Sequence, residues 1–132
     1  ITVVSYGSTL KIVEKAAVEL EKFNISCEII DCQSLIPFDL DNNIGESIKK
    51  TNRVIIIDED FSGGASAYIL DNLINKQNIY DYLDSKPHTL SAQDHRPAYG
   101  TDGDYFSKPS VDEVFNKIYS IMNELNPKKY PI

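Results

Sequence analysis

A run of four β-branched apolar residues, Val54 to Ile57, constrains the fold of this 132-residue chain more than any other feature. A strand with one face in water alternates apolar and polar residues, so an unbroken apolar run indicates a strand that is buried on both faces. Such strands are typical of parallel sheets that lie between two layers of helices. The stretch from Arg53 to Asp58 therefore predicts a buried strand of an α/β domain.

The segments on either side of this run predict the same alternation of strand and helix. Extended runs at Thr2–Tyr6 and Cys27–Cys32 precede it, and a shorter, more polar run at 88–92 follows it as an expected edge strand. Apolar residues at helical spacing lie between and after these runs. Four such units predict a single three-layer α/β/α domain, residues 1–132, with a mainly parallel sheet and right-handed crossovers.

Helix boundaries follow from capping residues and apolar spacing. Ser8 is predicted to cap the first helix, and Asp39 a second helix with an apolar face of Leu40, Ile44 and Ile48. The last helix is expected to open with a capping box, in which a serine and a glutamate three residues later satisfy each other's backbone N–H groups. That box and the apolar face expected behind it are Ser110, Glu113, Val111, Phe115, Ile118, Met122 and Leu125.

The charge and the cysteines of the chain exclude several classes of partner and location. With 20 acidic and 13 basic residues, a formal net charge of −7, it is expected to bind neither nucleic acid nor an anionic membrane surface. No apolar run approaches the ~18 residues of a membrane-spanning helix.

Cys27 and Cys32 lie five residues apart on one expected strand, so their side chains point to opposite faces of the sheet and cannot form a disulfide with each other. Two free thiols suit a reducing cytoplasm.

Ligands of open α/β sheets bind beyond the carboxyl ends of the strands, where this chain has three polar clusters. The first, residues 7–9, lacks the glycine pattern of a nucleotide-binding loop and reads as ordinary helix capping. The second, acidic cluster could hold a cation or accept a phosphoryl group, but contact with a neighbouring subunit is the favoured interpretation. The second and third clusters supply the candidate interface or crevice residues, namely Asp58, Glu59, Asp60, Gly63, Gly64, Asp94, His95 and Arg96.

Catalysis within the chain is not expected, and neither is a cofactor-binding or metal-binding residue. No serine or cysteine stands in a nucleophile elbow, and two histidines are too few for a histidine-rich metal site. The loop at 93–109 is nevertheless long for a compact domain, and such loops are usually functional or wait for a partner. For the loop at 93–109 we expect the second role, binding to a partner.

Several segments resemble the C-terminal, transketolase-type domain of the E1 component of 2-oxo acid dehydrogenases, most closely the beta subunit of the pyruvate and branched-chain (2-oxoisovalerate) enzymes. The pattern D-x-x-S/T-L/I-x-P-x-D is matched at Asp31–Asp39, and the block S-x-x-K-T-x-R at Ser47–Arg53. An acidic residue and a glycine pair follow, here Glu59 and Gly63-Gly64. After the last expected strand, Asp94 to Tyr99 replaces the family's D-x-P-x-P motif, and residues 100–104 form an insert. Which 2-oxo acid is used, and whether alpha and beta portions are fused, stay open.

The resemblance implies a sheet with strand order 2-1-3-4 and an antiparallel strand just before Ile1. Because the chain opens on an expected strand without an initiator methionine, we expect it to be excised from a longer polypeptide. The resemblance also implies that thiamine diphosphate and its magnesium ion lie between the two other domains of the holoenzyme. None of the family's cofactor-binding motifs falls in this chain, so the domain itself is expected to bind no cofactor.

The resemblance further implies a non-catalytic assembly role. The expected partners are the rest of E1 (the alpha and N-terminal beta portions), a second copy in a homodimer, and the subunit-binding domain of the E2 acyltransferase. Ile132 is a possible E2 contact. The alternative, from a different class, is a free-standing α/β ligand-binding or regulatory domain that uses the crevice between Asp58 and Gly64.

Overall fold

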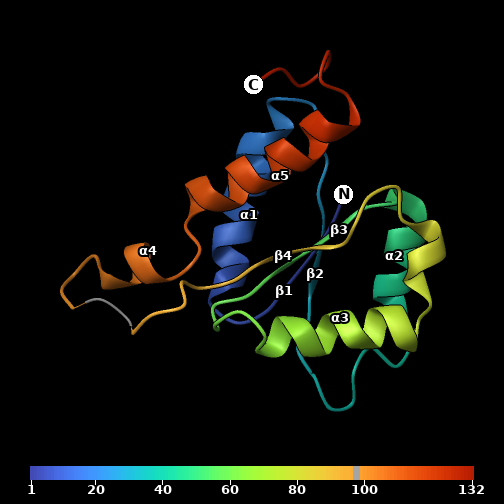
Figure 1. The fold of residues 1–132 in the computed structure, drawn as a ribbon, viewed down its shortest axis with the longest axis horizontal. Coiled ribbons are helices and arrows are strands. Elements are labelled where there is room, and N and C mark those ends of the chain that lie inside the picture. The colour runs from blue at the N-terminus through green and yellow to red at the C-terminus, as the bar shows by residue number, and fades with distance from the viewer. Residues whose placement is uncertain (97–98) are drawn as a thin grey trace.

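The computed structural model describes residues 1–96 and 99–132, apart from the side chain of residue 104. Strands and helices alternate along the described chain, with one short 3-10 helix, η1 (Figure 1). The elements are β1 Thr2–Ser5, α1 Thr9–Glu21, β2 Glu28–Asp31, α2 Asn43–Thr51, β3 Val54–Ile57, α3 Ala65–Asn75, η1 Ile79–Tyr82, β4 His88–Leu90, α4 Gly103–Ser107 and α5 Val111–Leu125.

The strands form one parallel sheet in the order β2-β1-β3-β4. β1 and β3 are the central strands, with Thr2 in register with Val54, and β4 lies at an edge as its polar sequence predicted. Every residue of β1 and β3 is buried. The α/β class and the strand order 2-1-3-4 are therefore confirmed, as is the buried strand predicted at Arg53–Asp58, which the structure has at Val54–Ile57.

Helices cover both faces of the sheet and give the three layers expected (Figure 1). α1 and α5 lie on one face, and α2 and α3 on the other. The sequence of β3 cannot alternate, because Ile55 and Ile57 pack into the first core while Val54 and Ile56 pack into the second. Both cysteines are free and lie on opposite faces, as predicted.

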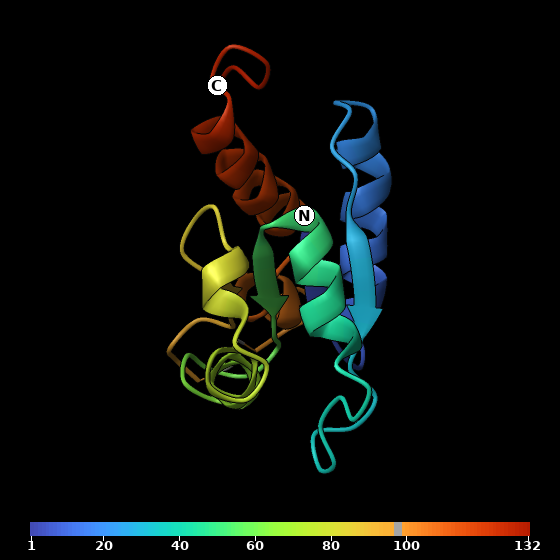
Figure 2. The same cartoon turned by 90° about the vertical axis from the view of Figure 1, so that its right-hand side faces the viewer.

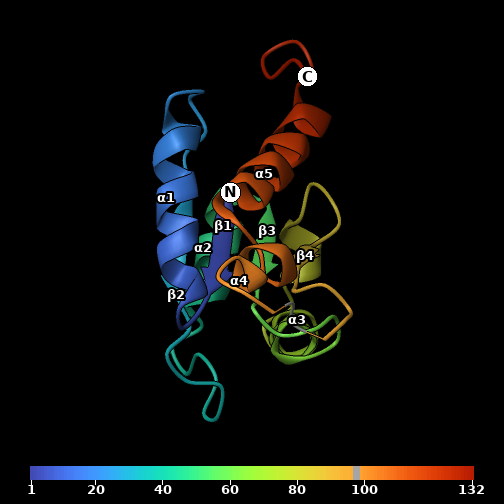
Figure 3. The same ribbon diagram turned by 90° about the vertical axis from the view of Figure 1, so that its left-hand side faces the viewer.

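Two segments that follow strands project from the sheet. The chain between β2 and α2, residues 32–42, extends beyond the helices as an irregular loop (Figure 2). The segment after β4 carries the short helix α4 away from the sheet (Figures 1 and 3). α4 replaces part of the uninterrupted loop that was expected at 93–109.

Two local predictions at helix starts need correction. Ser8 precedes α1 but does not cap it, because its hydroxyl donates a hydrogen bond to the side chain of Glu59. Leu40 is exposed and lies outside α2, which begins only at Asn43. The predicted role of Asp39 is confirmed nonetheless, since its carboxylate accepts hydrogen bonds from the first two backbone N–H groups of that helix.

The capping box at the start of α5 is confirmed, but the buried face of that helix differs from the expected one. Phe115 lies at the rim of the α1–α5 interface, where the centre of its ring is 5.5 Å from the centre of the Phe23 ring. The capping and buried residues of α5 are Ser110, Glu113, Val114, Ile118 and Ile121, and Leu125 is exposed. No helix in the described part of the chain is long and apolar enough to cross a membrane.

Candidate functional site

The crevice of this sheet lies between β1 and β3. These neighbouring strands send the helices that follow them, α1 and α3, to opposite faces, which leaves a switch point at their carboxyl ends. Tyr6 and Asp58 are the first residues beyond the two strands. The structure thus places the acidic cluster of the sequence at the position where α/β sheets bind ligands.

Asp58 is buried, and its carboxylate is fully engaged within the chain. It accepts hydrogen bonds from the Tyr6 hydroxyl and from the backbone N–H groups of Asp60 and Ser66, the last two at 2.9 Å. Ser66 lies in the first turn of α3, where a carboxylate stabilises the helix N-terminus. Burial, followed by the bond to Asp58, raises the pKa of Tyr6, so this phenol stays a hydrogen-bond donor. Asp58 therefore joins β1, β3 and α3 as a structural cap.

Glu59 connects two further segments at the surface of the crevice. Its carboxylate accepts a hydrogen bond from the Ser8 hydroxyl at 2.8 Å and pairs with the Lys108 ammonium at 3.3 Å. Ser8 belongs to the turn before α1, and Lys108 to the segment before α5. Both members of the ion pair are partly exposed, so water weakens it. Its contribution is to align these segments.

The glycine pair shapes the turn into α3. Gly63 has a φ of +92°, which side chains rarely adopt, and a Cβ on Gly64 would overlap the carboxylate of Asp60. The Gly64 N–H donates to the Phe61 carbonyl at 3.1 Å, so it is not available to an anion. The pair serves a tight backbone turn.

The third cluster lies near the crevice through its backbone but does not join it through side chains. A backbone hydrogen bond of 2.9 Å ties residue 92 to the acidic turn. Asp94, His95 and Arg96 are all exposed, and the Arg96 guanidinium lies over the ring of Tyr99 at 5.9 Å. No described hydrogen bond or ion pair links these three residues to the acidic cluster. Residues 97 and 98, part of the same motif, lie outside the described residues.

The described residues do not fit a magnesium ion and a diphosphate. No group of three histidine, cysteine, aspartate or glutamate side chains among them could hold a metal ion. Within the acidic cluster, Asp58 already accepts three hydrogen bonds and Glu59 pairs with a lysine, so neither carboxylate is an open ligand. Such a cofactor would need residues other than the described ones.

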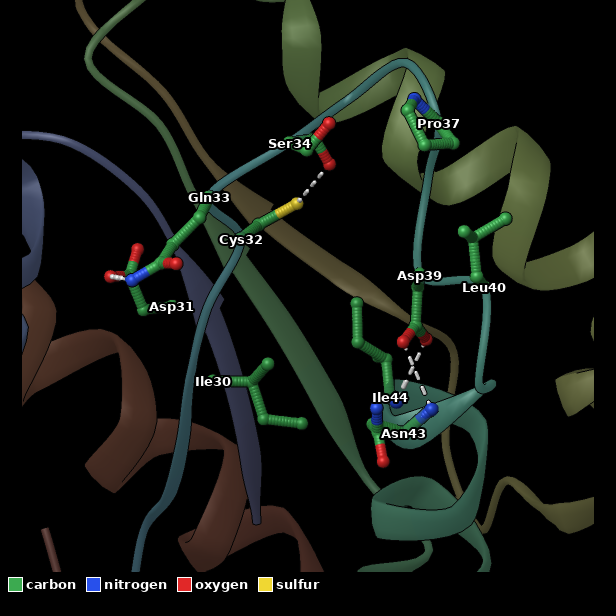
Figure 4. Close-up of a pocket in the computed structure, with 10 residues that line it drawn as sticks. All are labelled: Ile30, Asp31, Cys32, Gln33, Ser34, Pro37, Asp39, Leu40, Asn43 and Ile44. Carbon is green, nitrogen blue, oxygen red and sulfur yellow. Dashed lines mark hydrogen bonds between the residues drawn. The ribbon is translucent and has the colours of Figure 1, made fainter.

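A hollow of about 310 Å³, which the sequence did not predict, lies between the end of β2, the projecting loop and the start of α2 (Figure 4). Ile30, Pro37 and Leu40 line it, and the Cys32 thiol donates to the Ser34 carbonyl beside them. Burial raises the pKa of that thiol, which disfavours the reactive thiolate. The run of apolar residues at 35–38, followed by Leu40, was the available signal, but assigning Leu40 to a helix concealed it.

The C-terminal tail is anchored although its last residue is exposed. Tyr130 is buried, and its hydroxyl donates to the Asn24 carbonyl at 3.4 Å. The Tyr119 hydroxyl donates to the Pro131 carbonyl at 3.0 Å. Ile132, the expected partner contact, is 96% exposed and is therefore presented outward from a held position.

Comparison with known proteins places this arrangement in a family. The model of the family "Transketolase, C-terminal domain" matches residues 1–108. Pyruvate dehydrogenase E1 component subunit beta of Rickettsia bellii (strain RML369-C) is 33% identical over 122 residues, 92% of this chain and 37% of the relative. The same subunit of Rhizobium meliloti (strain 1021) is 32% identical over 120 residues, 91% of this chain and 26% of the relative.

A chloroplastic relative shows the same similarity over a shorter stretch. Pyruvate dehydrogenase E1 component subunit beta-2 of Arabidopsis thaliana is 42% identical over 94 residues, 71% of this chain and 23% of the relative. The chain thus spans little more than a third of the length of these relatives, or less. These matches confirm the resemblance to E1 beta subunits that the sequence motifs indicated. By its fold and by the match over its first 108 residues, this chain belongs to the transketolase C-terminal domain family.

Proposed function

We propose that this chain is the C-terminal assembly domain of the beta subunit of a thiamine diphosphate-dependent pyruvate dehydrogenase E1. The observation that carries the proposal is the similarity, over 92% of the chain, to a pyruvate dehydrogenase E1 beta subunit. The names of the relatives favour pyruvate over a branched-chain 2-oxo acid as the substrate of the whole enzyme. Thiamine diphosphate and magnesium would be held by its other domains.

The chemistry of the crevice supports a structural role for this domain. A general acid or base must reach the proton that it transfers. Asp58 is buried, and its oxygens are engaged by Tyr6, Asp60 and Ser66. The exposed His95 has no described carboxylate partner that would orient it as a base. The domain would therefore supply no catalytic group.

The surface supports the docking of other subunits. The partners would be the alpha and N-terminal beta portions of E1, a second copy of the domain, and the generally basic subunit-binding domain of the E2 acyltransferase. The net charge of −7 suits a basic partner, and Ile132 is held where a partner can reach it. Binding of the E2 domain should weaken as salt rises, because exposed charges are screened over ~8–10 Å at physiological salt.

Kinetics of the assembled enzyme test the non-catalytic role. E1 is prepared from the cognate alpha subunit and the full beta polypeptide, either wild type or carrying Glu59→Gln or His95→Ala. We expect the kcat for thiamine diphosphate-dependent decarboxylation of pyruvate, per assembled E1, to be unchanged. A loss of ~10²–10⁴-fold, the usual contribution of a general acid or base, would overturn the non-catalytic role. Wild-type E1 without pyruvate decarboxylation would overturn the assignment itself.

A free-standing ligand-binding domain has less support, because hydrogen bonds within the chain already engage the crevice between Asp58 and Gly64.

A cytoplasmic location is part of the proposal and is supported by the two free cysteines. Fractionation of the source cells would test it, and recovery of the chain in an oxidising compartment would contradict it.

A further inference from the structure

A second hollow, of about 350 Å³, lies between the projecting loop and helix α3 and is here called the loop–α3 hollow. Helix α3 lines it with Tyr68, Asn72 and Lys76, which stand four positions apart and so share one face of the helix. The loop lines it with residues 36–40 and 42. The volume lies within the ~300–1,000 Å³ of sites that bind small molecules.

The wall of the hollow suits a flat ring. Phe38 and Tyr68 stand edge to face, with ring centres 6.2 Å apart, and contribute one aromatic group from each side. Pro37 adds to this wall, and the exposed Ile36 and Leu40 stand at its edge. Apolar and aromatic walls with a few polar groups among them are typical of ligand sites.

Hydrogen bonds hold the two sides of the hollow in place. The Asp39 carboxylate accepts from the backbone N–H groups of Asn43 and Ile44, both at 2.9 Å. The Gln77 side chain donates to Asp39 at 2.8 Å and accepts from the backbone N–H of Gly45 at 2.9 Å. These bonds connect the loop, the start of α2 and the segment after α3. The hollow is therefore formed without a ligand.

Asn72 brings an unpaired acceptor to this hollow. The residue is 2% exposed, and its side-chain NH₂ donates to the Tyr68 carbonyl at 2.8 Å, which turns the amide oxygen away from that carbonyl. The oxygen is buried and accepts no hydrogen bond within the described part of the chain. Asp39 and Gln77 are already engaged, so they offer little to a water molecule, which needs two to four polar partners. Buried acceptors without a partner are rare and costly.

We propose that the loop–α3 hollow binds a small, flat, uncharged aromatic molecule that donates an N–H hydrogen bond from its edge to Asn72 Oδ1. Because the oxygen is buried, a narrow donor at the edge of a ring fits it better than a bulky, hydrated group. Lys76 opposes a cationic ligand, and the Asp39 carboxylate opposes an anionic one. This site goes beyond the proposed function, which assigns no ligand to the domain.

Two probes of nearly the same shape test the site, because indole has a ring N–H and benzofuran has an oxygen in its place. The full-length polypeptide is prepared with isotopically labelled asparagine, and each probe is titrated by NMR. The reporters are the side-chain amides of Asn72 and Asn42, which both line the hollow. We expect indole to shift both signals with a Kd at or below ~1 mM. Benzofuran should bind ~10-fold or more weakly, because it leaves the buried oxygen unpaired.

A matched pair of variants assigns this preference to Asn72. Asn72→Leu removes the acceptor at similar volume, and the Asn42 signal should then report equal affinities for indole and benzofuran. Asn75→Leu makes the same change at an exposed position of α3, where the amide donates to Asp71, and should keep the preference for indole. Without a probe, Asn72→Leu should not lower the free energy of unfolding in urea, since an apolar side chain replaces an unpaired acceptor.

Three results would overturn the site. They are equal affinities of the wild type for the two probes, no shift of the Asn42 and Asn72 signals by indole, and a clear loss of stability in Asn72→Leu, which would show that the oxygen has a partner within the fold. The first two are measured on the wild type and do not depend on the folding of a variant. None of them bears on the proposed function, which rests on similarity to E1 beta subunits.

Discussion

Truncation of Ile56 to alanine tests the position of β3 at the centre of the sheet. Ile56 is fully buried in the core that β3 forms with α2 and α3. The change removes three carbon atoms, and at ~0.8 kcal/mol for each buried methylene the loss of transfer free energy is ~2.4 kcal/mol. β1 and β4 are hydrogen-bonded to β3 on either side, so the vacated space can collapse only in part. The residual cavity adds ~24 cal/mol per Å³, which brings the expected loss to ~3–4 kcal/mol.

Ile36→Ala provides the matched control for this measurement. The same carbons are removed from a side chain that is largely in water, so the free energy of unfolding should change by no more than ~0.5 kcal/mol. The chain has no tryptophan, and tyrosine fluorescence together with far-UV circular dichroism should follow unfolding in urea. The midpoint and slope of each transition give the free energy of unfolding in water.

Two results would refute this reasoning. A loss below ~1 kcal/mol for Ile56→Ala, with an unchanged urea slope, would show that β3 is not packed between two helical layers. A loss of the same size for both variants would show that the loop at 32–42 packs against the body of the domain instead of projecting from it.

Three further predictions address the turn, the pH dependence and the cofactor. Gly64→Ala should destabilise the domain in urea, and Asp60→Ala should relieve much of the loss because the added Cβ overlaps that carboxylate; an unrelieved loss would contradict this. Burial lowers the pKa of His88, so folding disfavours its protonation and stability should fall as pH drops below ~6.5. His88→Gln should reduce that fall, and an unchanged pH profile would show that other groups cause it. Calorimetry of the chain with thiamine diphosphate and magnesium should show no binding; micromolar affinity would contradict the proposed division of roles.

The core of this domain could be predicted because its sequence pattern has one physical solution. Four successive β-branched apolar residues, Val54 to Ile57, need two covered faces, and the parallel sheet supplies them. The capping box could also be predicted, because its two residues, Ser110 and Glu113, lie within one helical turn. Both features were thus predicted correctly.

The two errors at helix starts have different causes, a distant partner for Ser8 and a misplaced helix boundary for Leu40. Ser8 has the composition of a helix cap, but Glu59, fifty-one positions away, takes its hydroxyl. Leu40 continues the spacing of a helix that begins three residues later, and so the projecting loop and its hollow were not foreseen. The candidate residues of the acidic turn were located at the switch point. Their engagement by hydrogen bonds depends on where Tyr6 and Ser66 lie in the fold.

The subunit composition of E1 with and without these 132 residues tests the assembly role most directly. Sedimentation velocity compares the cognate alpha subunit mixed with the full beta polypeptide and with a beta polypeptide from which this chain has been deleted. We expect a stable complex that contains both subunits in the first mixture, and separate alpha and beta species in the second. An equally stable complex in the absence of the chain would contradict the account.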